Sequence, residues 1–149
     1  MHVKQIQRKR LSLAALVVLA AAVLALLVCA RGSRGVMSLP YRVETPEGRQ
    51  AYLRALGWES DPATENVEER TLPETFDAVL TEYNALQRSQ GFDLTPYLGK
   101  TVTVVTCEGA ASEDGTPVLL TLWICDGVVI AGDAHTTALD GWMAPIVTE

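Results

Sequence analysis

Histidine, cysteine and carboxylate side chains are the groups of this 149-residue chain that could do chemistry, and few are spaced for it. His135 follows Asp133 by two positions, and Asp126 or Asp140 would have to supply a third ligand for a metal ion. Tight metal sites usually combine several His or Cys side chains at defined spacing. We therefore expect a polar loop after a strand here, with a metal site as the alternative.

Two cysteines, Cys107 and Cys125, follow the apolar N-terminal region, and either could pair with His135 as nucleophile and base. Both lie in segments that we expect to be strands. In a hairpin of residues 101–107 with residues 118–125, the cysteines are seven residues, roughly 23 Å, out of register. Bridged Cα atoms lie within about 7 Å of each other. We therefore expect two buried free thiols, although an oxidising exterior would permit a disulfide.

Common catalytic motifs are missing from the sequence. It contains no Gly-x-Ser-x-Gly nucleophile elbow, no His-Glu-x-x-His zinc helix and no Gly-x-x-x-x-Gly-Lys phosphate loop. The acids Glu113 and Asp114 precede Gly115, where a solvated turn is the simplest interpretation. The sequence therefore predicts no catalytic residue, no cofactor-binding residue and no metal ligand, and we expect the protein not to be an enzyme.

An unbroken run of 20 uncharged, mostly apolar residues occupies positions 11–30. As a helix it would span roughly the 30 Å of a bilayer core. Four basic residues precede it, so the positive-inside rule places residues 1–10 in the cytoplasm and the rest of the chain outside. We therefore expect a single-pass cell-membrane protein whose first partner is the lipid bilayer, through residues 11–30.

Two alternatives to a retained anchor stay open. A cleaved signal peptide usually has an apolar region of about 7 to 15 residues, shorter than this run, but Val28 to Ala30 would suit a cleavage site. Lipidation of Cys29 is the other alternative, although the preceding Val28 is bulkier than a lipidation site favours.

The region beyond the run is acidic. All 18 acidic residues and eight of the 12 basic ones lie there, a net charge of −10. Such a surface repels phosphate backbones, so nucleic-acid binding is disfavoured. We interpret residues 31–44 as a spacer and residues 45–149 as one extracytoplasmic domain.

Helical signals occur twice in this domain. Thr45 is a suitable N-cap before Pro46, and Gly57 can end the helix and return Trp58 onto Leu53. A second helix is predicted over residues 74–90, ending at Gly91. Its expected apolar stripe is Phe76, Val79, Leu80, Tyr83, Leu86 and Gln90.

Strand signals dominate the C-terminal half. Residues 101–107 and 118–125 are rich in β-branched and apolar residues, and Asp126-Gly127 predicts a tight hairpin into residues 128–130. Residues 61–70 lack a period and are interpreted as a loop leading into a short edge strand over 67–72. The segment with Leu139, Trp142, Met143 and Ile146 is irregular but apolar enough to cover an edge. The predicted fold is α+β, with helices on one face of a three- or four-stranded antiparallel sheet.

A recurring set of glycine stops, aromatics and stripe positions runs through the domain. It comprises Tyr52-Leu53, Leu56-Gly57-Trp58, Leu72-Pro73, Phe76, Glu82 to Gln87, Gln90 to Leu94, Tyr97 to Lys100, Asp126-Gly127, Gly132-Asp133 and Asp140 to Met143. In these residues the chain resembles the uncharacterised extracytoplasmic family called domain of unknown function 4830 (DUF4830). The resemblance implies a single-span protein of Gram-positive bacteria with an outside domain, and it implies no activity and no catalytic residue.

Anchor, spacer and acidic domain together favour a tethered extracytoplasmic binding or interaction module, with an unidentified protein or small ligand as partner. A structural or regulatory protein acting through helix pairing is an alternative, because Ala21 and Ala25 would allow close helix approach. A small thiol- or metal-dependent enzyme is the remaining one.

Overall fold

The computed structural model describes residues 42–113, 115–138 and 140–147, which form two α-helices, a 3-10 turn and five strands. The predicted anchor and the basic segment before it lie outside these residues. Within them, no helix is long and apolar enough to cross a membrane. In chain order the elements are α2 (Pro46–Ala55), β1 (Ser60–Thr71), α3 (Ala78–Ser89), the 3-10 turn η1 (Thr95–Tyr97), β2 (Thr101–Gly109), β3 (Val118–Cys125), β4 (Val128–Thr136) and β5 (Met143–Pro145).

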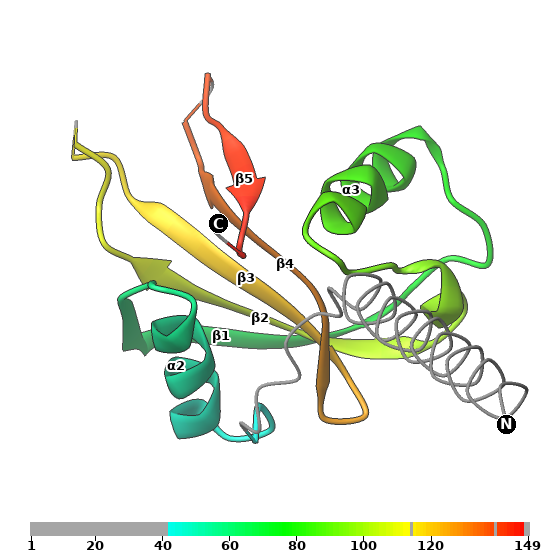
Figure 1. The fold of residues 1–149 in the computed structure, drawn as a ribbon, viewed down its shortest axis with the longest axis horizontal. Helices are drawn as coiled ribbons and strands as arrows, with labels where there is room; N and C mark the ends of the chain where they lie inside the picture. The colour runs from blue at the N-terminus through cyan, green and yellow to red at the C-terminus, as the bar shows by residue number, and fades with distance from the viewer. Residues whose placement is uncertain (1–41, 114, 139, 148–149) are drawn as a thin grey trace, which may run out of the picture. The chain divides into compact units, whose positions relative to one another are not determined.

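The strands form one antiparallel sheet in the order β1-β2-β3-β4-β5 (Figure 1). The α+β class and the antiparallel sheet are confirmed. The expected number of three or four strands is wrong, because the described sheet has five. The additional strand is β5, which pairs with β4 from His135↔Met143 to Asp133↔Pro145. Its three residues are too few to show an alternating pattern.

β1 is the largest difference from the sequence prediction. Residues 61–70, expected as a loop, belong to a strand that begins at Ser60 and pairs with β2. The pairing is interrupted between Asp61 and Asn66. Most side chains of β1 are exposed, because it is an edge strand, so backbone hydrogen bonds define it rather than alternating hydrophobicity. The expectation of an edge strand at this place is confirmed.

The N-terminal helix begins and ends where its sequence predicts. Thr45 is the N-cap and accepts a hydrogen bond from the backbone N–H of Gly48 at 3.1 Å. At the other end Gly57 has a φ of +90°, and the N–H of Trp58 donates to the carbonyl of Leu53 at 3.0 Å. This closure turns the chain sharply from α2 into β1.

The second helix begins later than predicted. The expected start at Glu74 is wrong, because the Asp77 carboxylate accepts from the Leu80 N–H at 2.7 Å and caps a helix that begins at Ala78. The expected apolar stripe holds only in part, since Val79 is 76% exposed. The helix buries two polar residues instead, Asn84 and Gln87.

α2 and α3 cover opposite faces of the sheet. Leu53 of α2 shares an enclosed space with Val105 and Leu122, which pair across β2 and β3. Tyr83 of α3 packs on the cluster that contains Val104. Because successive side chains of a strand point to opposite faces, the two helices lie on different sides. The expectation that they share one face is wrong, since a stripe marks which side of a helix is buried and not which face of the sheet it meets.

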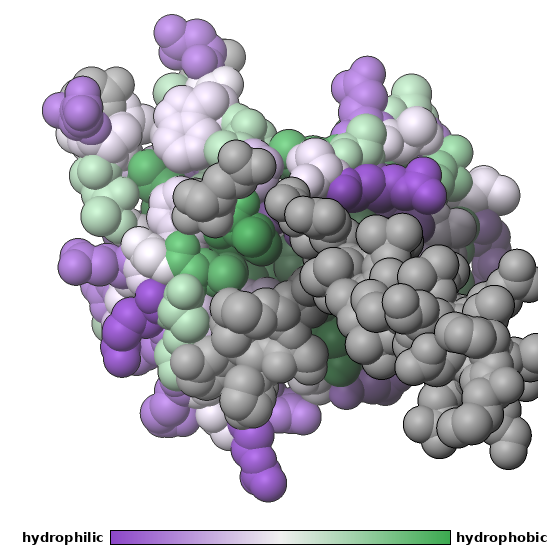
Figure 2. Space-filling model, viewed as in Figure 1, coloured by the Kyte–Doolittle hydropathy of each residue, from purple (hydrophilic) through white to green (hydrophobic). Residues whose placement is uncertain are grey.

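The apolar interior is therefore divided between the two faces. On the α3 side, a buried cluster is surrounded by partly buried aromatic and aliphatic side chains. At the surface, hydrophilic side chains project around the outline of the face shown in Figure 2. The buried members of the α3-side cluster are Leu72, Leu94, Val102, Val104, Cys125, Ile130 and Ala131.

Two side-chain amides at the C-terminal end of α3 form hydrogen bonds with the backbone of β4, at a residue that does not pair with the short strand β5. Gly132 donates its N–H to Gln87 Oε1 at 2.9 Å, and its carbonyl accepts from Gln90 Nε2 at 2.7 Å. Gln90 Oε1 also accepts the N–H of Val147 at 3.0 Å. The two carboxamides satisfy backbone groups that would otherwise need a neighbouring strand, so α3 is fixed to this edge by hydrogen bonds.

The Asp126-Gly127 turn is confirmed. Both residues have positive φ, 50° and 75°, and Cys125 and Val128 face each other across the two-residue loop. Asp-Gly tolerates this conformation, which a type I′ turn requires.

Candidate functional site

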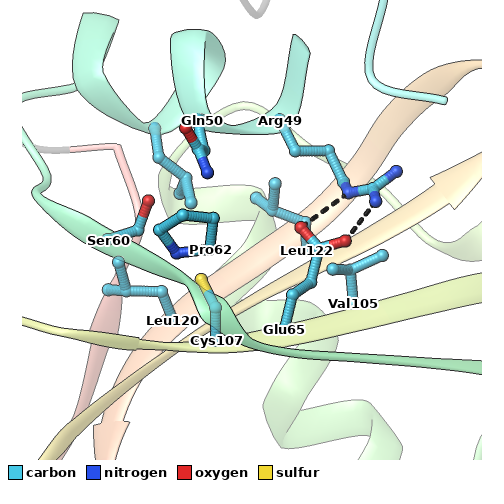
Figure 3. Close-up of a pocket in the computed structure, with 10 residues that line it drawn as sticks. Arg49, Gln50, Ser60, Pro62, Glu65, Val105, Cys107, Leu120 and Leu122 are labelled. Carbon is cyan, nitrogen blue, oxygen red and sulfur yellow. Dashed lines mark hydrogen bonds and ion pairs between the residues drawn. The ribbon is translucent and has the colours of Figure 1, made fainter. Parts of the chain in front are cut away.

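The junction between α2 and β1 holds a buried ion pair (Figure 3). Arg49 is 6% exposed, and its Nε donates to Glu65 Oε2 at 3.1 Å while a terminal nitrogen donates to Glu65 Oε1. A second terminal nitrogen of Arg49 donates to the Val43 carbonyl at 3.0 Å. The guanidinium thus ties α2 both to the edge strand and to the residues before the helix.

The space enclosed beside this pair is too small for a ligand. It is lined on one side by Leu120, Leu122 and Cys107 of the sheet and has a volume of about 10 Å³, room for about one water. Burial, followed by the Glu65 carboxylate, raises the pKa of the Cys107 thiol to about 11. Cys107 is therefore protonated at neutral pH, and this region is a packed contact rather than a nucleophilic site.

An open hollow adjoins the enclosed space and shares Gln50 and Ser60 with it. Its volume is about 270 Å³, and Arg54, Trp58 and Glu59 complete its lining. The residues come from α2, the residues after the Gly57 turn and the first residue of β1. This hollow is the one candidate ligand site that we pursue in the described residues.

Trp58 is held in place at the hollow. Its indole Nε1 donates to the backbone carbonyl of Ile146 at 2.6 Å, and Ile146 is fully buried. This hydrogen bond joins the turn after α2 to the segment that follows β5. The indole therefore has a fixed orientation, with its polar edge satisfied and its apolar ring available for packing.

A second polar cluster lies between α3 and β4. The buried Asp133 accepts a hydrogen bond from the Tyr83 hydroxyl at 2.6 Å, and its other oxygen lies 2.7 Å from His135 Nδ1. Burial, and then the charge of Asp133, raises the pKa of Tyr83 far above its usual value. The Tyr83 hydroxyl therefore keeps its proton and donates the hydrogen bond to Asp133. The ring centroids of Tyr83 and Trp123 are 5.4 Å apart. This carboxylate orients the imidazole, whose side chain is 26% exposed.

The side chains of the alternative metal site are not brought together. Asp133 and His135 contact each other, but Asp126 lies in the β3–β4 turn at the other end of β4. Among the described residues, no group of three or more His, Cys, Asp or Glu side chains could hold a metal ion.

The alternative of a cysteine–histidine dyad is excluded by the strand register. Cys125 pairs with Val128, seven residues before His135 on β4, so roughly 23 Å separates them. Cys107 belongs to the sheet face beneath α2, whereas His135 and its partner Asp133 belong to the face that Tyr83 contacts. Burial, and then Asp126, also raises the pKa of Cys125.

Both cysteines are buried and free, as predicted. Cys107 pairs with Leu120, five residues before Cys125 in β3, which is roughly 17 Å along the strand. The register differs by two residues from the predicted one, and the conclusion is unchanged. The two thiols also lie on opposite faces of the sheet, since Cys125 belongs to the cluster under α3.

Sequence reasoning missed the hollow. Its charged members, Arg54 and Glu59, are exposed in the structure, and nothing in the sequence distinguishes them from other charged residues. The only signal was the Leu-Gly-Trp stop, which indicates that Trp58 returns toward the helix end where Arg54 lies.

Comparison with known proteins gives a match to a protein family. It spans residues 52–112, from the second half of α2 to the residues after β2, and so includes Trp58, Glu59 and Ser60 of the hollow. Neither a curated protein nor a solved structure matches the chain. The resemblance that we expected for residues 126–143 lies outside the matched range. Over residues 52–112 the chain resembles the family described as Domain of unknown function (DUF4830), as its sequence predicts.

Proposed function

We propose that the chain is a membrane-anchored, extracytoplasmic binding module, with residues 11–30 in the bilayer and residues 45–149 outside the cell. The observation that carries this proposal is the 20-residue apolar run behind four basic residues. Its length matches a bilayer core, and the charge asymmetry sets the orientation. An anchored domain of this size acts on what reaches the membrane surface.

Binding is favoured over catalysis by the state of the polar side chains. The Cys107 and Cys125 thiols have raised pKa values, which disfavours a thiolate nucleophile. The Asp133 carboxylate already accepts from Tyr83 and contacts His135. The hollow beside α2 supplies polar side chains around open space, which suits a ligand that is held and not transformed.

The charge of the outer region restricts the partner. Its 18 acidic residues against eight basic ones disfavour nucleic acid and polyanions. The proposed partners are therefore the bilayer, through residues 11–30, and a protein or small molecule outside the cytoplasm.

Topology is tested with a tag placed ahead of Lys4 and protease added to intact cells. We expect digestion of the domain and protection of the tag. Replacing Arg8, Lys9 and Arg10 by serine should increase the fraction with the opposite orientation, because the positive-inside bias is weakened. A domain protected in the parent chain would contradict the proposal. Release of a tag-free domain into the medium would instead identify the run as a cleaved signal peptide.

A further inference from the structure

Two opposite charges line the open hollow without neutralising each other. Arg54 belongs to the last turn of α2, and Glu59 lies just before β1, on the other side of the Gly57 turn. Both side chains are exposed, and neither forms an ion pair or side-chain hydrogen bond with another described residue. Because both side chains line the hollow, a ligand in it could contact both.

The size of the hollow limits what it can hold. Its volume of about 270 Å³ lies just below the range of about 300 to 1,000 Å³ that is typical for drug-sized ligands. A single amino acid or monosaccharide fits, whereas a folded segment or an oligosaccharide does not fit as a whole.

The charges select among such small ligands. A simple anion would meet Glu59 and the acidic surroundings, and a simple cation would meet Arg54. A zwitterion satisfies both, because its carboxylate matches the guanidinium fork of Arg54 and its ammonium group can donate to Glu59. Gln50 can donate or accept beside them.

Trp58 adds an apolar surface to the same hollow. Its ring is oriented by the hydrogen bond from Nε1 to the Ile146 carbonyl, so the ring needs no ordering when a ligand binds. An aliphatic or aromatic side chain can pack on it while the charged groups face Arg54 and Glu59.

We propose that the hollow formed by Arg54, Trp58 and Glu59 binds a free α-amino acid with an apolar side chain. This inference rests on the proposed function as a binding module and names its ligand class. The carboxylate lies against Arg54, the ammonium group lies against Glu59, and the side chain packs on the indole.

The test uses the full chain in detergent micelles, with L-leucine as the probe and isothermal titration calorimetry as the measurement. Three analogues remove one feature each. They are 4-methylpentanoate, which lacks the ammonium group, 3-methylbutylamine, which lacks the carboxylate, and N-acetyl-leucine amide, which lacks both charges. We expect leucine to bind and each analogue to bind about tenfold or more weakly, because each loses a charge-assisted hydrogen bond.

Two variants assign each charge to its residue. In Arg54→Gln, leucine should bind no better than 3-methylbutylamine, because the carboxylate has lost its partner. In Glu59→Gln, leucine should bind no better than 4-methylpentanoate. Arg70→Gln and Glu82→Gln change the same side-chain types at exposed positions outside the hollow and should leave leucine binding unchanged. Because Arg54 and Glu59 are exposed, the circular dichroism spectrum should be unchanged in both variants.

Three results would overturn the inference. One is no leucine binding by the folded parent chain at concentrations well above about 1 mM. Another is equal binding of leucine and N-acetyl-leucine amide, which would mean that the charges select nothing. The third is preference for neutral N-acetylglucosamine, which would make the hollow a sugar site. None of these bears on the protease experiment, so a failed ligand and a failed topology are distinguishable.

Discussion

Removing one partner of the Arg49–Glu65 pair should destabilise the domain far more than removing both. Arg49 is 6% exposed and makes two hydrogen bonds to Glu65 and one to the Val43 carbonyl. In Glu65→Met the guanidinium stays charged and keeps only Val43 as a partner, because arginine does not lose its proton in proteins. An unpaired buried charge costs about 3 to 5 kcal/mol, and we place Glu65→Met at the upper end.

Arg49→Met should cost less, about 3 kcal/mol, because the Glu65 carboxylate that it leaves unpaired is slightly more exposed (11%) than the guanidinium (8%). The double variant replaces both polar groups by apolar ones of similar length and should lie within about 1 to 2 kcal/mol of the parent. The coupling between the two positions is then several kcal/mol.

Urea unfolding of the full chain measures these differences. All three tryptophans, at positions 58, 123 and 142, lie in the domain, so their fluorescence follows the domain and not the apolar run. The pair Arg70–Glu68 is the matched control, since it lies on the same strand with a 3.1 Å contact and both side chains at least half exposed. Replacing it by methionine should change the midpoint little. Additive effects of Arg49→Met and Glu65→Met would refute the reasoning.

The thiols, one half-exposed carboxylate and one buried hydroxyl give three further predictions. Alkylation of the unreduced, denatured chain should modify both Cys107 and Cys125, and a disulfide-linked peptide would contradict the strand register. Hydrogen bonds from Thr95 lower the pKa of Asp93 to about 2, so its stabilising effect is present above pH 4 and lost as the pH falls toward 2. Asp93→Asn should flatten that part of the urea-midpoint profile. Tyr83→Phe should lower the free energy of unfolding, measured with urea, by about 1 to 3 kcal/mol, because the buried Asp133 loses a hydrogen-bond donor.

Elements that rest on local chemistry were predictable from the sequence. The Thr45 cap, the Gly57 stop and the Asp126-Gly127 turn each follow from the conformational preference of one or two residues. The two central strands were visible because both of their faces are covered. These features depend on a few neighbouring residues and little on contacts with the rest of the chain.

Elements that rest on tertiary contacts were not predictable. β1 is extended because β2 lies beside it, and its exposed side chains carry no period. α3 buries Gln87 completely because Gly132 of β4 donates to its carbonyl oxygen, and nothing near Gln87 in the sequence indicates that partner. Tertiary contacts also determine which face of the sheet each helix packs on.

The candidate site depends on both kinds of element, which explains why sequence reasoning missed it. Arg54 and Glu59 are five residues apart on either side of the Gly57 turn, and that turn was predictable. The orientation of α2 relative to the turn is fixed by contacts between residues that are distant in the sequence. These contacts join Arg49 to Glu65 and Trp58 to Ile146. If the Arg49–Glu65 pair is broken in a chain that still folds, α2 loses its tie to β1, and the separation of Arg54 from Glu59 is no longer fixed. Leucine binding in the Arg49→Met/Glu65→Met variant should therefore be weaker than in the parent, even though neither residue touches the proposed ligand.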